Sequence, residues 1–196
     1  MLIYSRLCYN YGSDKRRHSD THFNERKLGY MSDHYIFREI AKEEIPQMFS
    51  MILERMKWMD EKGIRQWNVT DYDKVFPEAY YEAKRQMGEV FVLAETGGNK
   101  IVCAAVLQEQ DNYWPDCENA LYVHNFVSQI GERKVGEIFL RYVDEIARQR
   151  GKCYLRLDSA VDNQKLAEYY EAQGFIAVGK CEDGPYQGIL RQKQLV

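Results

Sequence analysis

Residues 131–136, Gly-Glu-Arg-Lys-Val-Gly, form a short polar turn that could bind an anion. The turn separates an apolar run over 121–127 from a segment whose apolar residues recur at helical spacing. A helix that begins here has unpaired backbone N–H groups and a partial positive charge at its N-terminus. Phosphate groups bind readily to such a helix end. The pattern therefore predicts an anion site, to which Arg133 and Lys134 could add positive charge.

The elements that position this turn are predicted from the apolar pattern on either side of it. Residues 121–127 are predicted to form a strand. The helix after the turn carries its apolar residues at Val135, Ile138, Phe139, Tyr142 and Ile146, and Gly151 marks its end. An alternating strand is expected over 153–158, followed by a helix over 162–173 that Gly174 ends. The predicted order is strand, turn, helix, strand, helix, strand.

Residues 152–179 carry a pattern that resembles the second half of the GNAT superfamily of N-acetyltransferases. A strand ends in Leu-Arg-Leu-Asp at 155–158, and Asp162-Asn163 opens a helix that contains Leu166 and Tyr-Tyr-Glu at 169–171. Gly-Phe at 174–175 begins the next strand. The resemblance extends more loosely from residue 35 to the C-terminus and does not cover residues 1–30.

This resemblance implies a single α/β domain with a mixed, mostly antiparallel sheet flanked by helices. It implies acetyl-CoA-dependent N-acetylation of a primary amine, on a small molecule or a peptide, by direct transfer without a metal. The turn would hold the pyrophosphate of acetyl-CoA, through Arg133, Lys134, Val135 and Gly136. The pantetheine arm would pair with the backbone of the preceding strand at Phe126 and Val127.

Asn163 and Tyr170 are seven residues apart, so they share one helix face with Leu166. The resemblance implies that Tyr170 donates a proton to the departing CoA thiolate and that Asn163 lies near the CoA arm. A phenol has a pKa of ~10 and a thiol ~8.5, so this transfer is feasible at close range. Tyr169 and Tyr170 could instead be core aromatics at helical spacing.

The turn departs from the usual family pattern, Gln/Arg-x-x-Gly-x-Gly/Ala. Gly136 keeps the last glycine, but Lys134 stands at the earlier glycine position and Gly131 stands where Arg or Gln is usual. The β-carbon of Lys134 could block close approach of the backbone to a ligand. The altered turn supports one alternative function, a non-catalytic acyl-CoA-binding or regulatory module on the same fold. A longer acyl group than acetyl also stays open.

The sequence indicates less clearly which residue accepts the proton of the amine and which residues form the pocket for the acceptor substrate. A base must remove the proton of the amine, and Glu109 and His124 are candidates, although His124 could be a satisfied histidine on a half-buried strand. A helix is predicted from Ile45 to Met59, and the resemblance implies that it shapes the acceptor site with the loop after it. We place Trp58 and Trp67 in that loop, as pocket walls or as satellite core.

Composition limits the partners of the chain. A net charge of −3 is unlike the basic excess of a nucleic-acid-binding protein, and no apolar run approaches the ~20 residues of a membrane span. The five cysteines are widely spaced without a Cys-x-x-Cys, which favours reduced thiols in a cytoplasmic protein and no metal. His18 and His22 have the spacing of a helical metal pair but lack further ligands. A homodimer is possible.

Residues 1–30 lack any hydrophobic period and are expected to be a disordered extension or a misassigned start, with Met31 as the natural beginning of the domain over 31–196. The basic cluster over 15–18 could instead contact a partner. Further elements are predicted as a strand over 35–40, a helix over 77–87, a hairpin of 90–94 with 101–107, a polar loop over 108–118, and closing strands over 175–178 and 186–190.

Overall fold

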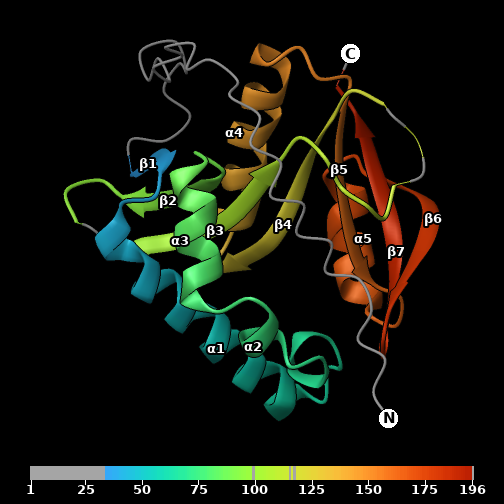
Figure 1. The fold of residues 1–196 in the computed structure, drawn as a ribbon, viewed down its shortest axis with the longest axis horizontal. Helices are drawn as coiled ribbons and strands as arrows, with labels where there is room; N and C mark the ends of the chain where they lie inside the picture. The colour runs from blue at the N-terminus through green and yellow to red at the C-terminus, as the bar shows by residue number, and fades with distance from the viewer. Residues whose placement is uncertain (1–33, 99, 115, 117, 196) are drawn as a thin grey trace.

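The computed structural model describes residues 34–98, 100–114, 116 and 118–195 (Figure 1). The expectations for residues 1–30, including the Met31 start, the basic cluster and the His18–His22 pair, lie outside the described residues. In the part that is described, no helix combines the length and the apolar character needed to cross a bilayer. The same residues contain no group of three His, Cys, Asp or Glu side chains placed to hold a metal ion.

The described residues form one seven-stranded sheet in the order β1-β2-β3-β4-β5-β7-β6. Its strands are β1 (Tyr35–Glu39), β2 (Val90–Glu95), β3 (Ile101–Gln108), β4 (Ala120–Ser128), β5 (Tyr154–Ala160), β6 (Ile176–Asp183) and β7 (Tyr186–Gln194). Every neighbouring pair is antiparallel except β4 with β5, which is parallel. The mixed, mostly antiparallel sheet expected from the sequence is confirmed.

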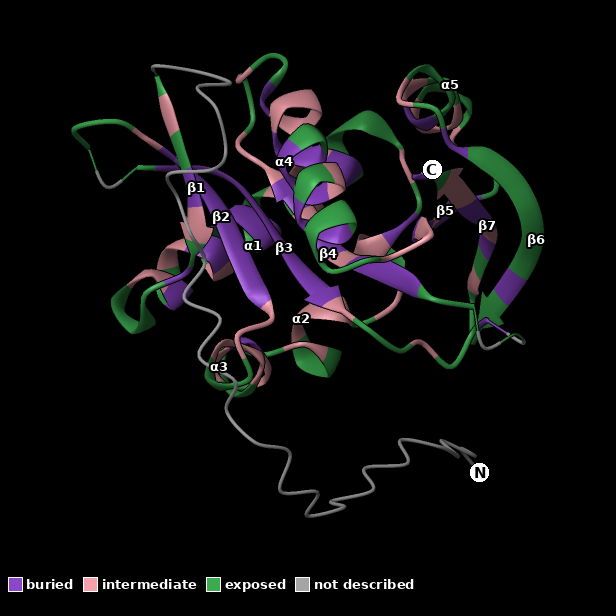
Figure 2. Ribbon diagram, turned by 90° about the horizontal axis from the view of Figure 1, so that it is seen from above, coloured by how far each residue is buried: buried purple, intermediate pink, exposed green. Residues whose placement is uncertain are grey.

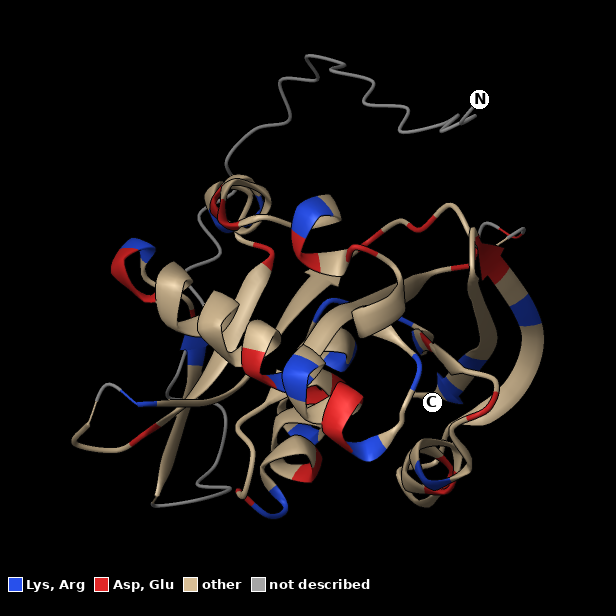
Figure 3. Cartoon of the chain, turned by 90° about the horizontal axis from the view of Figure 1, so that it is seen from below, with Lys and Arg blue, Asp and Glu red and all other residues tan. Residues whose placement is uncertain are grey.

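Helices cover both faces of this sheet (Figures 1 and 2). They are α1 (Ile45–Lys62), α2 (Tyr72–Val75), α3 (Glu78–Gln86), α4 (Val135–Gln149) and α5 (Gln164–Ala172), with short 3-10 turns at Lys42–Glu44 and Trp67–Val69. The apolar stripe of α4 packs on β1 to β5 in one core that also takes in Tyr170 and Phe175. Residues of α1 and α3 pack on the opposite face in a second core. Acidic and basic residues are interspersed along the helices and loops (Figure 3).

The strands β4 and β5 pair only where they begin. Ala120, Leu121 and Tyr122 pair with Tyr154, Leu155 and Arg156, and no pairing follows beyond Arg156. On its other side β5 continues to pair with β7 as far as Ala160. The two parallel strands therefore diverge toward their C-terminal ends (Figure 1), and backbone groups on the facing edges lose their ladder partners there.

Two local expectations are wrong. Trp58 lies on α1 and not in the following loop, because α1 continues to Lys62 and ends at Gly63, whose left-handed φ of 65° is least strained for glycine. The loop over 108–118 is not simply polar, because Trp114 is buried against Tyr122 and its ring lies 4.1 Å from the guanidinium carbon of Arg156.

Candidate active site

A β-bulge at Asn125 lies a short way beyond Tyr122, the last residue of β4 that pairs with β5. Ala104 pairs with Val127 but Val106 pairs with His124, so β4 carries one extra residue here. Asn125 takes up this residue with a φ of 51°, a left-handed conformation that asparagine tolerates better than most residues.

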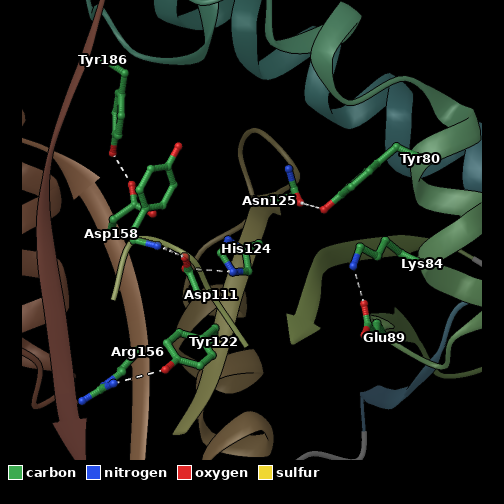
Figure 4. Close-up of polar contacts among 11 residues, drawn as sticks. Tyr80, Lys84, Glu89, Asp111, Tyr122, His124, Asn125, Arg156, Asp158 and Tyr186 are labelled. Atoms are coloured by element: carbon green, nitrogen blue, oxygen red, sulfur yellow. Dashed lines mark hydrogen bonds and ion pairs between the residues drawn. The ribbon is translucent and has the colours of Figure 1, made fainter. Parts of the chain in front are cut away.

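The side chain of Asn125 is held by two tyrosines from the α1 face of the sheet. Its Nδ2 donates to the hydroxyl of Tyr72, 2.5 Å away on α2. Its Oδ1 accepts from the hydroxyl of Tyr80 on α3 at 3.5 Å (Figure 4). Helices α2 and α3 thus fix the backbone of β4 at the start of the opening.

His124 precedes the bulge and faces a buried carboxylate. Its Nε2 lies 3.3 Å from Oδ2 of Asp111, a residue of the β3–β4 loop whose side chain is 7% exposed. The contact lacks the alignment of a hydrogen bond, so Nε2 is buried without a hydrogen-bond partner among the residues that the structure describes. The other carboxylate oxygen of Asp111 accepts from the backbone N–H of Tyr113 at 2.7 Å. Asp111 therefore orients the His124 ring, but it forms no hydrogen bond with Nε2.

Asp158 of β5 stands across the opening from His124 (Figure 4). The hydroxyl of Tyr186, on β7, donates to Oδ2 of Asp158 at 2.5 Å. Burial raises the pKa of the Asp158 carboxyl, while the hydrogen bond from Tyr186 and the nearby His124 act in the opposite direction. Burial and the Asp158 carboxylate raise the pKa of the Tyr186 phenol, so Tyr186 stays a donor. Asp158 is a further candidate for a functional residue. It belongs to the sequence motif, but the sequence alone assigned it no role.

Tyr170 reaches the same region from α5. Its ring packs edge-on against Tyr169 and Phe175, with centroids 5.3 and 5.7 Å away. Burial raises the pKa of the Tyr170 phenol, and the charge of Asp158 adds to this effect. Among the described residues, the hydroxyl has no hydrogen-bond partner. Tyr170 is therefore a core aromatic with a hydroxyl that has no partner among the described residues, and its role as proton donor stays a prediction.

The turn before α4 has an unusual backbone. Lys134 is the N-cap residue of α4 and has a φ of 64°. This left-handed conformation explains why a glycine suits the position, and Lys134 adopts it at a steric cost of about 1–2 kcal/mol. Arg133 and Lys134 are exposed and Val135 is buried. The first turn of α4 follows directly, so its backbone N–H groups lie at the C-terminal end of β4.

The other predicted site residues occupy varied places. Asn163 caps α5, because its Oδ1 accepts from the backbone N–H of Leu166 at 3.1 Å. Phe126 packs its ring on Phe139, and Val127 is buried in the core under α1. Trp67 stacks on Tyr72 at 4.6 Å, next to the tyrosine that holds the bulge.

Two predicted site residues make their contacts away from the opening. The ring of Trp58 lies 4.9 Å from the guanidinium carbon of Arg55 on the same helix. Glu109 forms ion pairs with Lys152 at 3.0 Å and with Arg150 at 3.7 Å. These cations follow α4 and precede β5, so Glu109 lies at the closed end of the β4–β5 pair.

Comparison with known proteins identifies the family. A sequence model described as the acetyltransferase (GNAT) family matches residues 57–175. The chain therefore belongs to the GNAT acetyltransferases, as its motif had suggested. No curated protein sequence matches it.

Solved structures share the fold at low sequence identity. A GNAT acetyltransferase from Listeria monocytogenes is 19% identical with a TM-score of 0.67, over 82% of this chain and 94% of that one. The PaiA N-acetyltransferase from Thermoplasma acidophilum, in complex with coenzyme A, is 14% identical with a TM-score of 0.65, over 82% and 98%. The protein yncA from Salmonella typhimurium, with its cofactor acetyl-CoA, is 17% identical with a TM-score of 0.59, over 84% and 95%.

Proposed function

We propose that the protein transfers an acetyl group from acetyl-CoA to a primary amine of a small molecule or peptide, directly and within a ternary complex. The observation that carries this proposal is the opening between β4 and β5, combined with a Tyr170 hydroxyl that has no partner among the described residues and whose phenol lies within electrostatic range of Asp158 on β5. Two of the structural neighbours are described with coenzyme A or acetyl-CoA, which supports the choice of donor.

The chain offers groups for each part of this donor. The unpaired backbone edge of β4 at Phe126 and Val127 would pair with the amide groups of the pantetheine arm. The first turn of α4, from Val135 and Gly136, would hold the pyrophosphate, with Arg133 and Lys134 adding charge. Asn163, by capping α5, would keep the helix that carries Tyr170 in place.

Tyr170 would act as the general acid. When bound, acetyl-CoA supplies an activated acyl group and a thiolate leaving group. The raised pKa of Tyr170 keeps its phenol protonated at neutral pH, so that it can donate to the sulfur as the thioester bond breaks. Holding both reactants in one opening supplies much of the acceleration, because the reaction becomes effectively unimolecular.

The donor site is tested by calorimetric titration with acetyl-CoA of the wild type and of Gly136→Trp. We expect micromolar binding to the wild type and loss of binding in the variant, since an indole at this position would fill the first turn of α4. Absence of binding to acetyl-CoA and to longer acyl-CoAs at ~1 mM would overturn the proposal. Binding without transfer to any amine would favour a non-catalytic acyl-CoA-binding module.

The catalytic part is tested by an amine screen that uses spermidine, a tripeptide with a free N-terminus and an Nα-protected lysine amide. Tyr170→Phe is expected to reduce kcat by ~10²-fold or more while acetyl-CoA still binds, because only the proton donor is removed. Equal kcat values for the two proteins would contradict the role of Tyr170.

We also expect a cytoplasmic location, which suits the free thiols of Cys103, Cys153 and Cys181.

A further inference from the structure

The carboxylate of Asp158 faces the opening from the strand opposite the bulge. The last residue of β5 that pairs with β4 is Arg156, whereas Asp158 itself pairs with Leu190 of β7. The edge of β5 that faces β4 is therefore free at Asp158. Among the described residues, the only side chain that donates a hydrogen bond to this carboxylate is Tyr186, which binds Oδ2. The carboxylate keeps capacity to accept a further proton donor.

A second pair of titratable groups stands next to Asp158. Asp111 lies between Asp158 and His124 in Figure 4, and its Oδ2 is 3.3 Å from Nε2 of His124. Neither ring nitrogen of His124 has a hydrogen-bond partner among the described residues, but only Nε2 is fully buried. The Nδ1 atom thus retains accessible surface. The site contains a carboxylate held by a tyrosine and an imidazole held by a carboxylate, contributed by three strands and a loop.

We propose that Asp158 is the general base that takes the proton from the acceptor amine, that Tyr186 and His124 stabilise its carboxylate, and that Asp111 orients His124. This assignment deepens the proposed function and rests on it. Of the two bases suggested by the sequence, Glu109 is engaged by Lys152 and Arg150 at the closed end of the strands. His124 lies beside the opening but belongs to the supporting pair.

The proton and bond balance is complete with the groups at the site. The amine nitrogen attacks the thioester carbonyl carbon, a C–N bond forms, and the C–S bond breaks. The carboxylate of Asp158 receives the proton that leaves the nitrogen, and the phenol of Tyr170 gives its proton to the departing thiolate. Proton exchange with water returns Asp158 to the carboxylate and Tyr170 to the phenol. An acceptor that arrives as an ammonium releases one further proton to solvent.

The surroundings of Asp158 suit a base. The titratable groups near it come from several elements: Tyr72 of α2, Asp111 and Tyr113 of the β3–β4 loop, His124 of β4, Tyr170 of α5, Cys181 of β6 and Tyr186 of β7. Burial moves the pKa of Asp158 upward, toward the working pH, where a carboxylate is a better proton acceptor. Burial raises the pKa of the Cys181 thiol to about 12, and the carboxylates of Asp158, Asp111 and Asp183 add to this shift, so several negative charges lie near one another here. This charge would favour an acceptor that approaches as an ammonium.

The test compares Asp158→Asn with the wild type, on whichever amine of the screen the wild type acetylates fastest. We expect kcat/KM to fall by ~10²–10⁴-fold, with acetyl-CoA affinity changed by less than about twofold. The isosteric amide can still accept from Tyr186, so the fold should be retained. Asp71→Asn is the matched control, because Asp71 is exposed and, in the part of the chain that the structure describes, its side chain forms an ion pair with Lys74 at the surface. It should leave kcat/KM unchanged.

Tyr186→Phe provides a second measurement, the pH dependence of kcat/KM. This dependence would not change if Asp158 had only a structural role. Loss of the hydrogen bond to Oδ2 should raise the pKa of Asp158, because this bond stabilises the carboxylate. Since the base acts as the carboxylate, the acidic limb of the kcat/KM profile should move to higher pH. The ring remains to fill its place in the core.

The outcomes are distinct. The assignment of Asp158 is overturned if Asp158→Asn keeps at least a third of wild-type kcat/KM. It is also overturned if Tyr186→Phe leaves the acidic limb of the pH profile in place. Either result leaves the proposed function intact. A wild type that binds acetyl-CoA but acetylates no amine overturns the proposed function and this inference together. Loss of activity in Asp158→Asn with binding retained and the limb shifted in Tyr186→Phe supports the inference.

Discussion

The hydroxyl oxygen of Tyr169 lies 2.5 Å from the point where a β-carbon would stand at Gly136. The ring of Phe126 is next nearest, with its Cζ at 3.6 Å, so residue 136 is enclosed by side chains from α5 and β4. Its φ is not left-handed. Glycine at the first turn of α4 thus leaves space for the Tyr169 hydroxyl, and Tyr169 connects α5 to the turn that we propose to bind the donor.

We predict that Gly136→Ala destabilises the protein by about 1–2 kcal/mol, because the added methyl group forces the Tyr169 hydroxyl to move. In a Tyr169→Phe background, the same substitution should be neutral or slightly stabilising, since the remaining ring carbon is at the ordinary contact distance of 3.5 Å. Urea unfolding of the four proteins measures the coupling. An equal cost in both backgrounds would contradict the contact.

Lys134→Gly should stabilise the protein by up to about 1 kcal/mol. Lysine at a φ of 64° carries steric strain that glycine lacks, although glycine is more flexible in the unfolded chain. Lys134→Ala is the matched control, because it also removes the charge but keeps the β-carbon. Chemical denaturation should rank the glycine variant above the alanine variant, and the reverse order would show that the turn is not strained.

Asn125 should be sensitive in two separable ways. Asn125→Gly keeps a residue that adopts a φ of 51° and loses only the contacts with Tyr72 and Tyr80, at a cost of about 1–2 kcal/mol. Asn125→Ala loses the same contacts and adds left-handed strain of about 1 kcal/mol. Thermal unfolding monitored by circular dichroism should therefore place alanine below glycine. Identical melting temperatures would argue against strain at the bulge.

The Asp116–Arg156 pair should contribute to stability in a defined pH range. Oδ1 of Asp116 lies 2.6 Å from the buried guanidinium of Arg156, and the hydrogen bond lowers the pKa of the Asp116 carboxyl. Because the folded pKa lies below the unfolded value of ~3.9, the pair stabilises above that pH and the contribution is lost as the pH falls through the folded pKa.

This pair is tested with Asp116→Asn. The variant should lose about 1 kcal/mol near neutral pH, a modest figure because the Asp116 side chain is 42% exposed. Its free energy of unfolding should then fall less than that of the wild type between about pH 5 and pH 2. Guanidinium denaturation at a series of pH values measures how the free energy of unfolding of each protein changes with pH. The same pH dependence in both proteins would contradict the contribution of the Asp116 carboxylate to stability.

The sequence by itself determined the elements around the opening. The apolar residues of α4 recur at helical spacing, and Gly151 and Gly174 adopt the positive φ expected beyond the ends of α4 and α5. Asn163 caps α5 close to the predicted helix start. These features were predictable because helix period, caps and stops depend on neighbouring residues. The family motif over 155–175 is local in the same way, and so it led to the correct fold.

Only the tertiary structure decided how the side chains meet. Asp158 and His124 belong to different strands, and they face one another because β4 and β5 part beyond Tyr122 and Arg156. Trp114, in a loop expected to be polar, is buried because it packs with Tyr122 and Leu190, and the guanidinium of Arg156 lies over its ring. The left-handed conformations of Asn125 and Lys134 depend on the sheet register and on where α4 packs. Apolar periodicity reports which face of an element is buried, but it carries no information about partners far along the chain, and those partners form the site.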